Sequence, residues 1–294
     1  MKIGIGLKCH SYTPEAYAYS QYLTKNGFTT QLDDENNLDD SNDINIHFLG
    51  LRPFWKKKSG KVVEIHEYQS LSTGAFPKSK DLIKRIVNKK PVGRIFLNNV
   101  VKDHIGFRDD VPNICRDMGV DSALFQRPSL NPSFDIVYSG SISGRIGLID
   151  ELIRLANLDL RILIVGDVSD DVRTLFSPYK KVHFSGRVKR ENLPELYRQC
   201  RAGLNYTPDM YPFNIQTSTK TLEYLASGLH VLSNRYVWSL NFFSDKLGVV
   251  TWLEEFHGDF KFQNQKHQIL DMSNYAWERI LDDSNFIDFL KASI

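Results

Sequence analysis

The sequence predicts an α/β fold made of two doubly wound, Rossmann-like domains that face each other across a cleft. Short runs rich in β-branched residues alternate with amphipathic helical segments over most of the 294 residues. The connecting segments are short, which favours parallel sheets covered by helices on both faces. Because the alternation is interrupted at 126–133, beside two prolines, we expect one domain at 1–130 and another at 131–294. The prediction leaves room for the last helix to pack back on the first domain.

The first domain is predicted to begin with a buried strand at 2–9, followed by a helix. Thr13 is placed to cap this helix, Pro14 fits its first turn, and Gly27 marks its end. The Asn- and Asp-rich segment 33–43 is expected to be a loop, because it lacks the spaced glycine and glutamate of a metal site. Further strands are predicted at 43–51, 61–68 and 93–101, with a helix at 81–89.

The second domain repeats this rhythm more regularly. Its strands are predicted at 134–140, 160–167, 180–186, 202–208 and 230–234, and its helices at 148–158, 191–200 and 219–228. Asn192 is expected to cap the second of these helices, and Gly228 to end the third. Ligands of open α/β sheets bind at the carboxyl ends of the strands. We therefore expect the functional site in the cleft between the domains.

The composition argues against several classes of protein. Thirty-seven basic and 35 acidic residues leave a net charge of +2, so no nucleic-acid partner is expected. No apolar stretch approaches the roughly 20 residues that span a bilayer, and the amino terminus lacks the cleavage site of a signal peptide. The three cysteines, at 9, 115 and 200, lack the spacing of a zinc site or a disulfide framework. Free thiols in a reducing cytoplasm are expected.

The segment 52–94 is strongly basic, with twelve Lys and Arg against three Asp and Glu, a net charge of +9. One interpretation is a solvated face. The other is a surface that meets an anionic partner, such as phospholipid headgroups or a lipid-linked phosphate. Phe54 and Trp55 stand directly before the lysines at 56–58, an apolar wedge beside a cationic cluster that suits a membrane interface.

The start of the helix at 219–228 has the features of a phosphate site. The residues around this start are polar: Gln216, Thr217, Ser218 and Thr219. Unpaired N–H groups and a positive dipole at a helix start favour a phosphate. Lys220 opposes that dipole, which a bound diphosphate would explain. Glu223, on the same face, can accept hydrogen bonds from two ribose hydroxyls. The alternative is a surface pair between Lys220 and Glu223, and spacing alone does not separate the two.

The segment KTLEYLASGLHVL, from Lys220 to Leu232, resembles the K-x-x-E-Y-x-A-x-G-x-x-V signature of GT-B glycosyltransferases. The resemblance is closest to their retaining family 4, also called group 1. Upstream, 137–155 resembles the strand, Gly-rich turn and helix that open the second domain of that family. The segment 182–208 resembles its F-x-G-x-V…L-P-x-L-Y-x-x-A…L-x-P region. The resemblance covers about 134–240.

This resemblance implies a nucleotide-sugar donor site in the second domain. Glu223 would hold the ribose hydroxyls, and Arg187 and Val188 would flank the base. Lys220, Arg145 and the turn at 216–219 would neutralise the diphosphate. Two positions depart from the family, because Ile215 replaces the first glutamate of E-x7-E and Ser141 replaces an arginine of the Gly-rich turn. The candidates to replace that glutamate are Asp209, Asn214 and Gln216.

The first domain is expected to bind the acceptor. His10 follows the first predicted strand, and His66 lies within a later one. Either imidazole could hydrogen-bond the acceptor or the transferred sugar, or be a structural histidine.

The predicted function is a cytoplasmic, hexosyltransferase-type glycosyltransferase of surface polysaccharide synthesis, peripheral at the inner membrane face. It would move a sugar from a nucleoside-diphosphate donor, UDP by preference, to a hydroxyl of a glycan or polyprenyl-linked acceptor, with retention. No metal or other cofactor is expected, because no convincing Asp-x-Asp loop is present. The alternatives are a non-catalytic binding subunit, suggested by Ile215 and Ser141, and a GT-B sugar-nucleotide epimerase. A Rossmann dehydrogenase is disfavoured, since the glycines at 140, 144 and 147 do not form GxGxxG.

Overall fold

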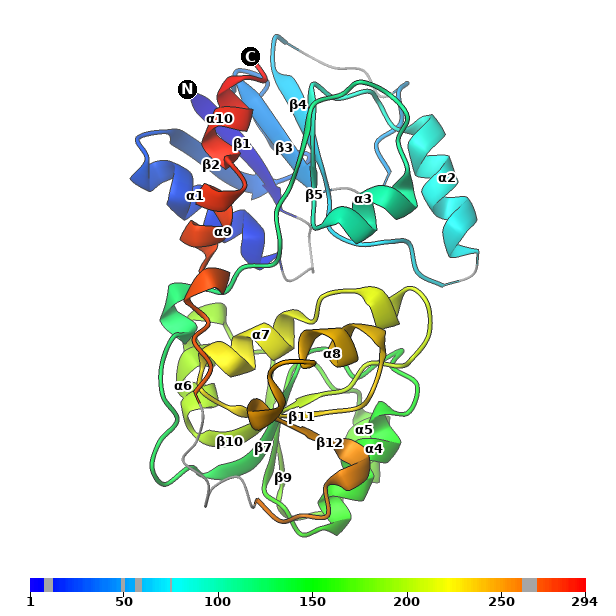
Figure 1. Cartoon of the computed structure of the whole chain (residues 1–294), viewed down its shortest axis with the longest axis vertical. Helices are drawn as coiled ribbons and strands as arrows, with labels where there is room; N and C mark the ends of the chain where they lie inside the picture. The colour runs from blue at the N-terminus through cyan, green and yellow to red at the C-terminus, as the bar shows by residue number, and fades with distance from the viewer. Residues whose placement is uncertain (8–12, 49–50, 56–59, 75, 261–268) are drawn as a thin grey trace. The chain divides into compact units, whose positions relative to one another are not determined.

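The computed structural model describes residues 1–7, 13–48, 51–55, 60–74, 76–260 and 269–294 (Figure 1). The chain divides into two compact units. Unit 1 comprises Met1–Gly119 and Asn274–Ile294, and unit 2 comprises Val120–Ser273. The contacts thus place 120–130 in unit 2 and return the carboxyl-terminal segment to unit 1.

Unit 1 is built on a six-stranded parallel sheet in the order β2-β1-β3-β4-β5-β6. Its strands are β1 Lys2–Leu7, β2 Thr29–Asp34, β3 Ile44–Phe48, β4 Val63–Tyr68, β5 Gly93–Phe96 and β6 Asn113–Cys115. Its helices are α1 Pro14–Lys25, α2 Pro77–Val87, α3 Asn99–Ile105, α9 Trp277–Asp283 and α10 Phe286–Lys291. The predicted doubly wound α/β architecture is confirmed for this half of the chain.

The carboxyl-terminal helices of unit 1 pack beside α1, as Figure 1 shows. The ring of Tyr19 on α1 lies 4.5 Å from that of Phe286 on α10, and meets Trp277 on α9 edge to face. Gly119 is needed for this packing, because a Cβ there would lie 2.4 Å from the Trp277 indole. Aromatic burial therefore ties both ends of the chain into one core.

Unit 1 departs from the sequence prediction in its local boundaries. The run 93–101 is not one strand, because β5 ends at Phe96 and Asn98 caps α3 by accepting the Val101 N–H at 3.0 Å. An Asn side chain that captures a backbone N–H favours a helix start over a continued strand. Thr13 makes no such cap on α1. The start of the predicted loop 33–43 is the end of β2.

Unit 2 contains a second six-stranded parallel sheet, in the order β12-β11-β10-β7-β8-β9. Its strands are β7 Phe134–Ser139, β8 Ile162–Val165, β9 Val182–Gly186, β10 Cys200–Asn205, β11 His230–Ser233 and β12 Val250–Trp252. Its helices are α4 Leu148–Asn157, α5 Asp170–Leu175, α6 Leu193–Arg198, α7 Thr219–Ala226 and α8 Val237–Phe242.

The core of unit 2 forms where helix stripes meet the strands. Leu148, Leu152 and Leu155 of α4 are fully buried and pack in one cluster with Ile162 and Ile164 of β8. The spacing of these leucines is the helical repeat that predicted the helix. The predicted strands and helices of this unit are all present, whereas α5, α8 and β12 were missed. Asn192 makes no side-chain cap on α6.

The strand order of unit 2 reverses direction at β7. The chain runs outward from β7 to β8 and β9, then crosses back to β10 on the other side of β7. In open parallel sheets, the carboxyl ends of the strands at such a reversal leave a place for ligands. The ends of β7 and β10 are therefore the place in unit 2 to look for a site. No helix within the described residues is long and apolar enough to cross a membrane.

Candidate functional site

Three segments converge on this edge of unit 2. The turn 140–147 follows β7, the segment 206–207 follows β10, and the start of α7 lies against both. Arg145 donates from the turn to the Tyr206 carbonyl oxygen at 3.4 Å, and the Ser218 hydroxyl donates to Asn205 Oδ1 at 2.9 Å. Residues from distant parts of the sequence are thereby brought together within one unit.

Lys220 is the central cation of this cluster. Its Nζ lies 4.7 Å from the centre of the Tyr138 ring and 3.4 Å from the Tyr138 hydroxyl. Loss of hydration, and next the charge of Arg145, lower the pKa of Lys220 to about 7, while Glu223 acts in the opposite direction. A cation held in this way is stabilised by an incoming anion.

The turn after β7 fits closely against this lysine. Gly140 has a φ of +124°, and a Cβ at this position would lie 3.0 Å from the Lys220 Cε. The Tyr138 hydroxyl donates to the Ser141 carbonyl oxygen at 2.8 Å, which holds the turn in place. The Ser141 side chain is exposed, at the position where the resemblance noted in the sequence implies an arginine. The turn therefore brings Lys220 and Arg145 to one place while leaving Ser141 toward solvent.

Glu223 is buried and does not lie on the surface. It is 6% exposed, and its Oε2 accepts a hydrogen bond from the Tyr197 hydroxyl at 3.2 Å. The Tyr197 hydroxyl also lies 2.7 Å from Ser139 Oγ, at the end of β7. Because both Glu223 and Lys220 are held by neighbours within the fold, the interpretation of a solvated surface pair does not apply to them.

The start of α7 is where the sequence predicts it. Ser218 is the cap and accepts the Thr221 N–H at 3.3 Å, and Thr219 is the first helical residue. Gln216 donates from its side chain to the Pro212 carbonyl oxygen at 3.1 Å, and Thr217 lies between these two residues. The positive end of the α7 dipole therefore lies beside the Lys220 and Arg145 charges.

The other predicted donor residues lie further along the same sheet edge. Arg187 and Val188 follow β9, and the Arg187 side chain forms an exposed ion pair with Asp167 at 3.5 Å. Ile215 ends a 3₁₀ turn, and its neighbour Asn214 donates to Asp209 at 3.0 Å. A polar pair thus stands close in sequence to the missing family glutamate.

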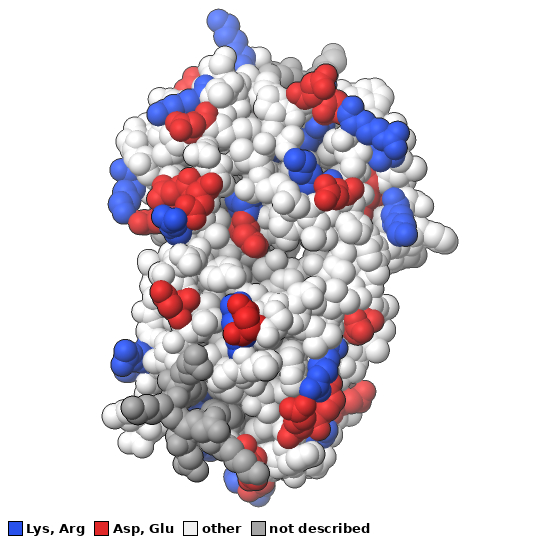
Figure 2. Space-filling view, in the orientation of Figure 1, with Lys and Arg blue, Asp and Glu red and all other residues white. Residues whose placement is uncertain are grey.

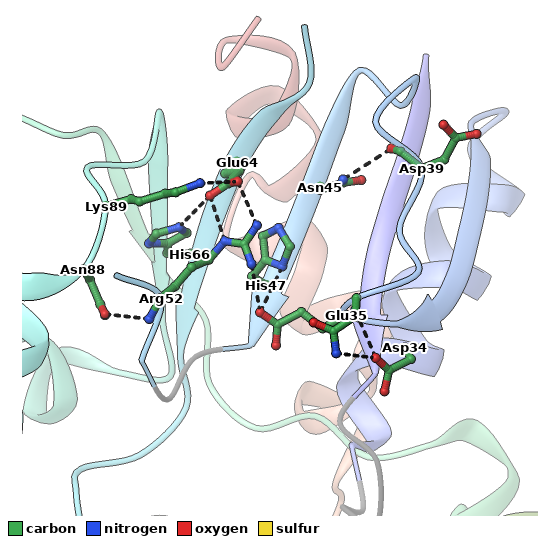
Figure 3. A network of polar contacts seen from close by, with 11 residues as sticks. Asp34, Glu35, Asp39, Asn45, His47, Arg52, Glu64, His66, Asn88 and Lys89 are labelled. Atoms are coloured by element: carbon green, nitrogen blue, oxygen red, sulfur yellow. Dashed lines mark hydrogen bonds and ion pairs between the residues drawn. The ribbon is translucent and has the colours of Figure 1, made fainter. Parts of the chain in front are cut away.

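His66 lies in unit 1, within a buried polar network on one face of the sheet (Figure 3). Its ring is 0% exposed and its Nε2 lies 3.4 Å from Glu64 Oε2. Burial lowers the pKa of His66 to about 4, against the influence of Glu64. Arg52 and Lys89 pair with the same glutamate at 2.8 and 3.3 Å. This is the environment of a structural histidine, and an acceptor contact of His66 stays a prediction. His10 lies outside the described residues.

Sequence reasoning missed several residues that build the site. Tyr138 and Ser139 belong to a predicted strand and Tyr197 to a predicted helix, so their apolar neighbours suggest only core packing. What distinguishes these three residues from ordinary core residues is a hydroxyl group at a buried position, because a buried hydroxyl needs a hydrogen-bond partner. Among the described side chains, no group of three or more His, Cys, Asp or Glu residues could hold a metal ion.

Comparisons with known proteins found one family match and several similar structures. A family model described as glycosyl transferase-like matches residues 145–288. No protein with curated annotation matches the chain in sequence.

Solved structures show the same fold. The chain is similar to AviGT4, a glycosyltransferase involved in avilamycin A biosynthesis (14% identity, 99% of this chain and 97% of that chain, TM-score 0.62). It is similar to sucrose-phosphate synthase from Thermosynechococcus elongatus (13% identity, 100% of both chains, TM-score 0.67). It is also similar to HepE from Anabaena in complex with UDP and glucose (10% identity, 100% of both chains, TM-score 0.63). The chain therefore has the GT-B fold, and the family match over its second half is consistent with a glycosyltransferase of the group 1 type.

Proposed function

We propose that the protein transfers a hexosyl group from a UDP-sugar donor, bound at the start of α7, to a hydroxyl of a glycan or lipid-linked acceptor. The observation that carries this proposal is the pair formed by Lys220, a poorly hydrated cation, and Glu223, a buried carboxylate, on one turn of α7. A diphosphate and a ribose present the complementary groups, negative charge and paired hydroxyls. Structures of HepE have been solved in complex with UDP and with UDP-glucose.

In the proposed reaction the main task of the protein is to stabilise charge. The bond between the anomeric carbon and the donor phosphate oxygen breaks, and its electron pair stays on the diphosphate. The acceptor oxygen takes its place at that carbon, and the hydroxyl proton passes to the departing diphosphate. Lys220 and Arg145 would stabilise the charge that grows on the diphosphate, which favours the transition state over the ground state. Retention of configuration is proposed from the family resemblance.

Neutralisation of the diphosphate by these residues would make a metal ion unnecessary. Two cations and the dipole of α7 are available at the same place. Arg187 and Val188 are proposed to flank the base, and Asp209, Asn214 or Gln216 to replace the family glutamate at 215. A role in surface polysaccharide synthesis is proposed on the same resemblance.

Binding of UDP tests this assignment through Glu223. We expect Glu223→Ala to weaken UDP binding by about tenfold or more, because hydrogen bonds between a charged group and the ribose hydroxyls are lost. Isothermal titration calorimetry gives the dissociation constant, and a thermal melt checks that the variant is folded. The matched control is Glu195→Ala, which removes an exposed carboxylate that pairs with Arg198 on α6. Equal affinities of Glu223→Ala and wild type would contradict the proposal.

A turnover assay separates the transferase from its two alternatives. An active transferase would slowly hydrolyse the matching UDP-sugar when no acceptor is present. A non-catalytic binding subunit, suggested by Ile215 and Ser141, would bind UDP without any turnover. An epimerase would convert the donor sugar in the absence of acceptor. Product analysis of one reaction by mass spectrometry and chromatography distinguishes all three.

One surface of unit 1 supports the proposal of a lipid-linked acceptor, because it has the features of a membrane-binding surface. We call it the α2 surface and define it by six exposed apolar side chains: Phe54, Trp55, Phe76, Leu82, Ile83 and Ile86. On α2 the usual arrangement of apolar side chains inside and charged side chains outside is reversed, because Asp81 is buried and Ile86 is 67% exposed. Contiguous exposed apolar side chains of this kind mark interaction sites.

The aromatic part of the α2 surface is held rigidly beside the helix. The Phe54 N–H donates to the Val87 carbonyl oxygen at 2.9 Å, and the Lys89 N–H donates to the Arg52 carbonyl oxygen at 2.9 Å. The Arg52 side chain is anchored by Glu64 and Glu35 at 2.8 and 3.2 Å (Figure 3). These contacts tie the backbone at 52–54 to the end of α2, next to two exposed rings.

The charge around the α2 surface is positive. Basic side chains lie along the edge of unit 1 that α2 occupies (Figures 1 and 2). On α2 and the residues after it they are Lys78, Lys80, Lys84, Arg85, Lys89 and Lys90. Apolar side chains ringed by lysines complement an anionic lipid surface, which offers both phosphate charge and hydrocarbon. We therefore propose that unit 1 docks on an anionic membrane through the α2 surface.

Vesicle flotation tests this docking. We expect Ile83→Glu/Ile86→Glu to reduce binding to vesicles that contain phosphatidylglycerol by about tenfold or more, since apolar burial is lost and like charge is added. The control is Leu175→Glu, an exposed leucine on α5 that is 51% exposed. Binding should be weaker to phosphatidylcholine alone and should fall with added salt. The membrane assignment would be overturned if the wild type does not float with the vesicles. It would also be overturned if the wild type is a dimer in solution and the double variant is a monomer, since the α2 surface would then be a contact between two copies.

A further inference from the structure

Tyr197 lies in unit 2 next to Glu223 and has no role in the reaction proposed above. It lies on α6 and is fully buried, and its ring meets that of Tyr224 edge to face, with ring centres 5.3 Å apart. Its hydroxyl lies between two polar groups, 2.7 Å from Ser139 Oγ and 3.2 Å from Glu223 Oε2. A buried hydroxyl with two well-placed partners connects the end of β7 to a carboxylate on α7.

The hydrogen bonds in this cluster have a single consistent direction. Tyr197 has one hydroxyl proton and donates it to Glu223, so it accepts from Ser139. The Ser139 proton is then engaged, so the Tyr224 hydroxyl, 3.1 Å away, donates to Ser139 Oγ. The Tyr224 oxygen in turn accepts the Ser139 backbone N–H at 2.9 Å. Burial raises the pKa of Tyr224, which keeps its proton in place.

This chain of hydrogen bonds ends on Glu223. Each donor in such a chain polarises the next, so the last bond is strengthened. Lys220 lies three residues earlier on α7, a spacing at which opposite charges pair. A hydrogen bond from Tyr197 competes with that pairing and restrains the carboxylate to one orientation. Every member of the chain is 7% exposed or less, so water does not replace a missing link easily.

We infer that Tyr197 is a positioning residue that orients Glu223 toward the two ribose hydroxyls of the donor. It therefore sets the preference of the site for ribonucleotides over nucleotides that lack these hydroxyls. The inference rests on the proposed function, because it takes Glu223 to be the ribose contact. Tyr197 itself acts through Glu223 and touches no reacting atom.

The test compares UDP with 2′,3′-dideoxy-UDP. We expect Tyr197→Phe to weaken UDP binding by about 3- to 10-fold, the value of one hydrogen bond. Binding of the dideoxy compound should change by less than about twofold, because it lacks the groups that Glu223 would hold. Calorimetry gives both dissociation constants, and the readout is the constant for the dideoxy compound divided by the constant for UDP. Loss of packing alone weakens both ligands equally and leaves this ratio unchanged. If Tyr197→Phe does not fold, Tyr224→Phe breaks the same chain one link earlier and should lower the same ratio.

Two further variants make the outcomes distinct. Tyr68→Phe is the matched control, since it removes a buried hydroxyl, hydrogen-bonded to Asn88 in unit 1, and should leave the ratio unchanged. A ratio lowered by Glu223→Ala and unaffected by Tyr197→Phe would overturn the positioning role alone. A ratio unaffected by Glu223→Ala would overturn the ribose contact and the proposed donor site with it. Equal weakening of both ligands by Tyr197→Phe would show a structural role instead.

Discussion

Replacing Lys220 by methionine is expected to slow sugar transfer by about 10²–10³-fold, the usual effect of losing one charge contact at a transition state. The same change should leave the fold as stable as the wild type, or more stable, at neutral pH. Lys220 has a pKa near 7 in the folded chain and an ordinary pKa of 10.5 when unfolded. Its charge therefore costs stability, and methionine keeps the length of the side chain over the Tyr138 ring.

The change in stability caused by Lys220→Met is expected to depend on pH. Between about pH 7 and 10.5 the unfolded chain binds more protons at Lys220 than the folded chain, so this residue makes stability rise with pH in that window. The advantage of Lys220→Met should be at its full value at pH 7 and below, and be lost above about pH 10.5. Thermal melts at both pH values and donor turnover at saturating UDP-sugar measure the two halves of the prediction.

Lys246→Met is the matched control for this experiment. The Lys246 ammonium lies 5.2 Å from the centre of the Phe242 ring in the same unit, so it also contacts an aromatic face. It pairs with Asp245 at 2.5 Å and lies outside the site. Its replacement should leave transfer unchanged. A Lys220→Met variant that keeps transfer within about threefold of the wild type would contradict the electrostatic role.

Replacing Arg116 by methionine is expected to lower the free energy of unfolding by about 3–5 kcal/mol, the cost of stranding a buried charge. The side chains of Arg116 and Glu67 are both 0% exposed and form an ion pair in the core of unit 1. The Arg116 Nε also donates to the Tyr19 hydroxyl at 2.7 Å, and the guanidinium lies 5.2 Å from the centre of the Trp277 ring. Without it, the Glu67 carboxylate stays buried beside aromatic rings.

Urea unfolding of single and double variants measures this loss. The double variant Arg116→Met/Glu67→Leu should recover much of the stability, because removing both charges leaves no uncompensated group. Lys25→Met is the control, since Lys25 and Glu278 form an exposed pair between α1 and α9 and their loss should change little. A double variant as unstable as Arg116→Met would show that shape, and not charge, explains the effect.

The local elements followed from the sequence because their signals are local. The leucine repeat of α4 and the Ser218 cap of α7 are read from neighbours within one or two turns of helix. The same holds for Lys220 and Glu223, which share a helical face by spacing alone. Prediction was poorest where a choice depended on the surroundings. In α2 the buried residue is Asp81, which accepts the Ser72 N–H at 3.1 Å, while the aliphatic side chains face outward.

Two parallel α/β units, the start of α7 and the two charged residues on it could be predicted from the amino-acid sequence, since periodicity and caps act over a few residues. The partners of those two charged residues became known from the three-dimensional structure. Tyr138, Tyr197 and the Gly140 turn reach Lys220 and Glu223 from elements far away in the chain. The three-dimensional structure also showed that His66 is enclosed beside Glu64 and that α9 and α10 return to α1. Such contacts depend on how the strands are ordered in each sheet, and no short stretch of sequence encodes that order.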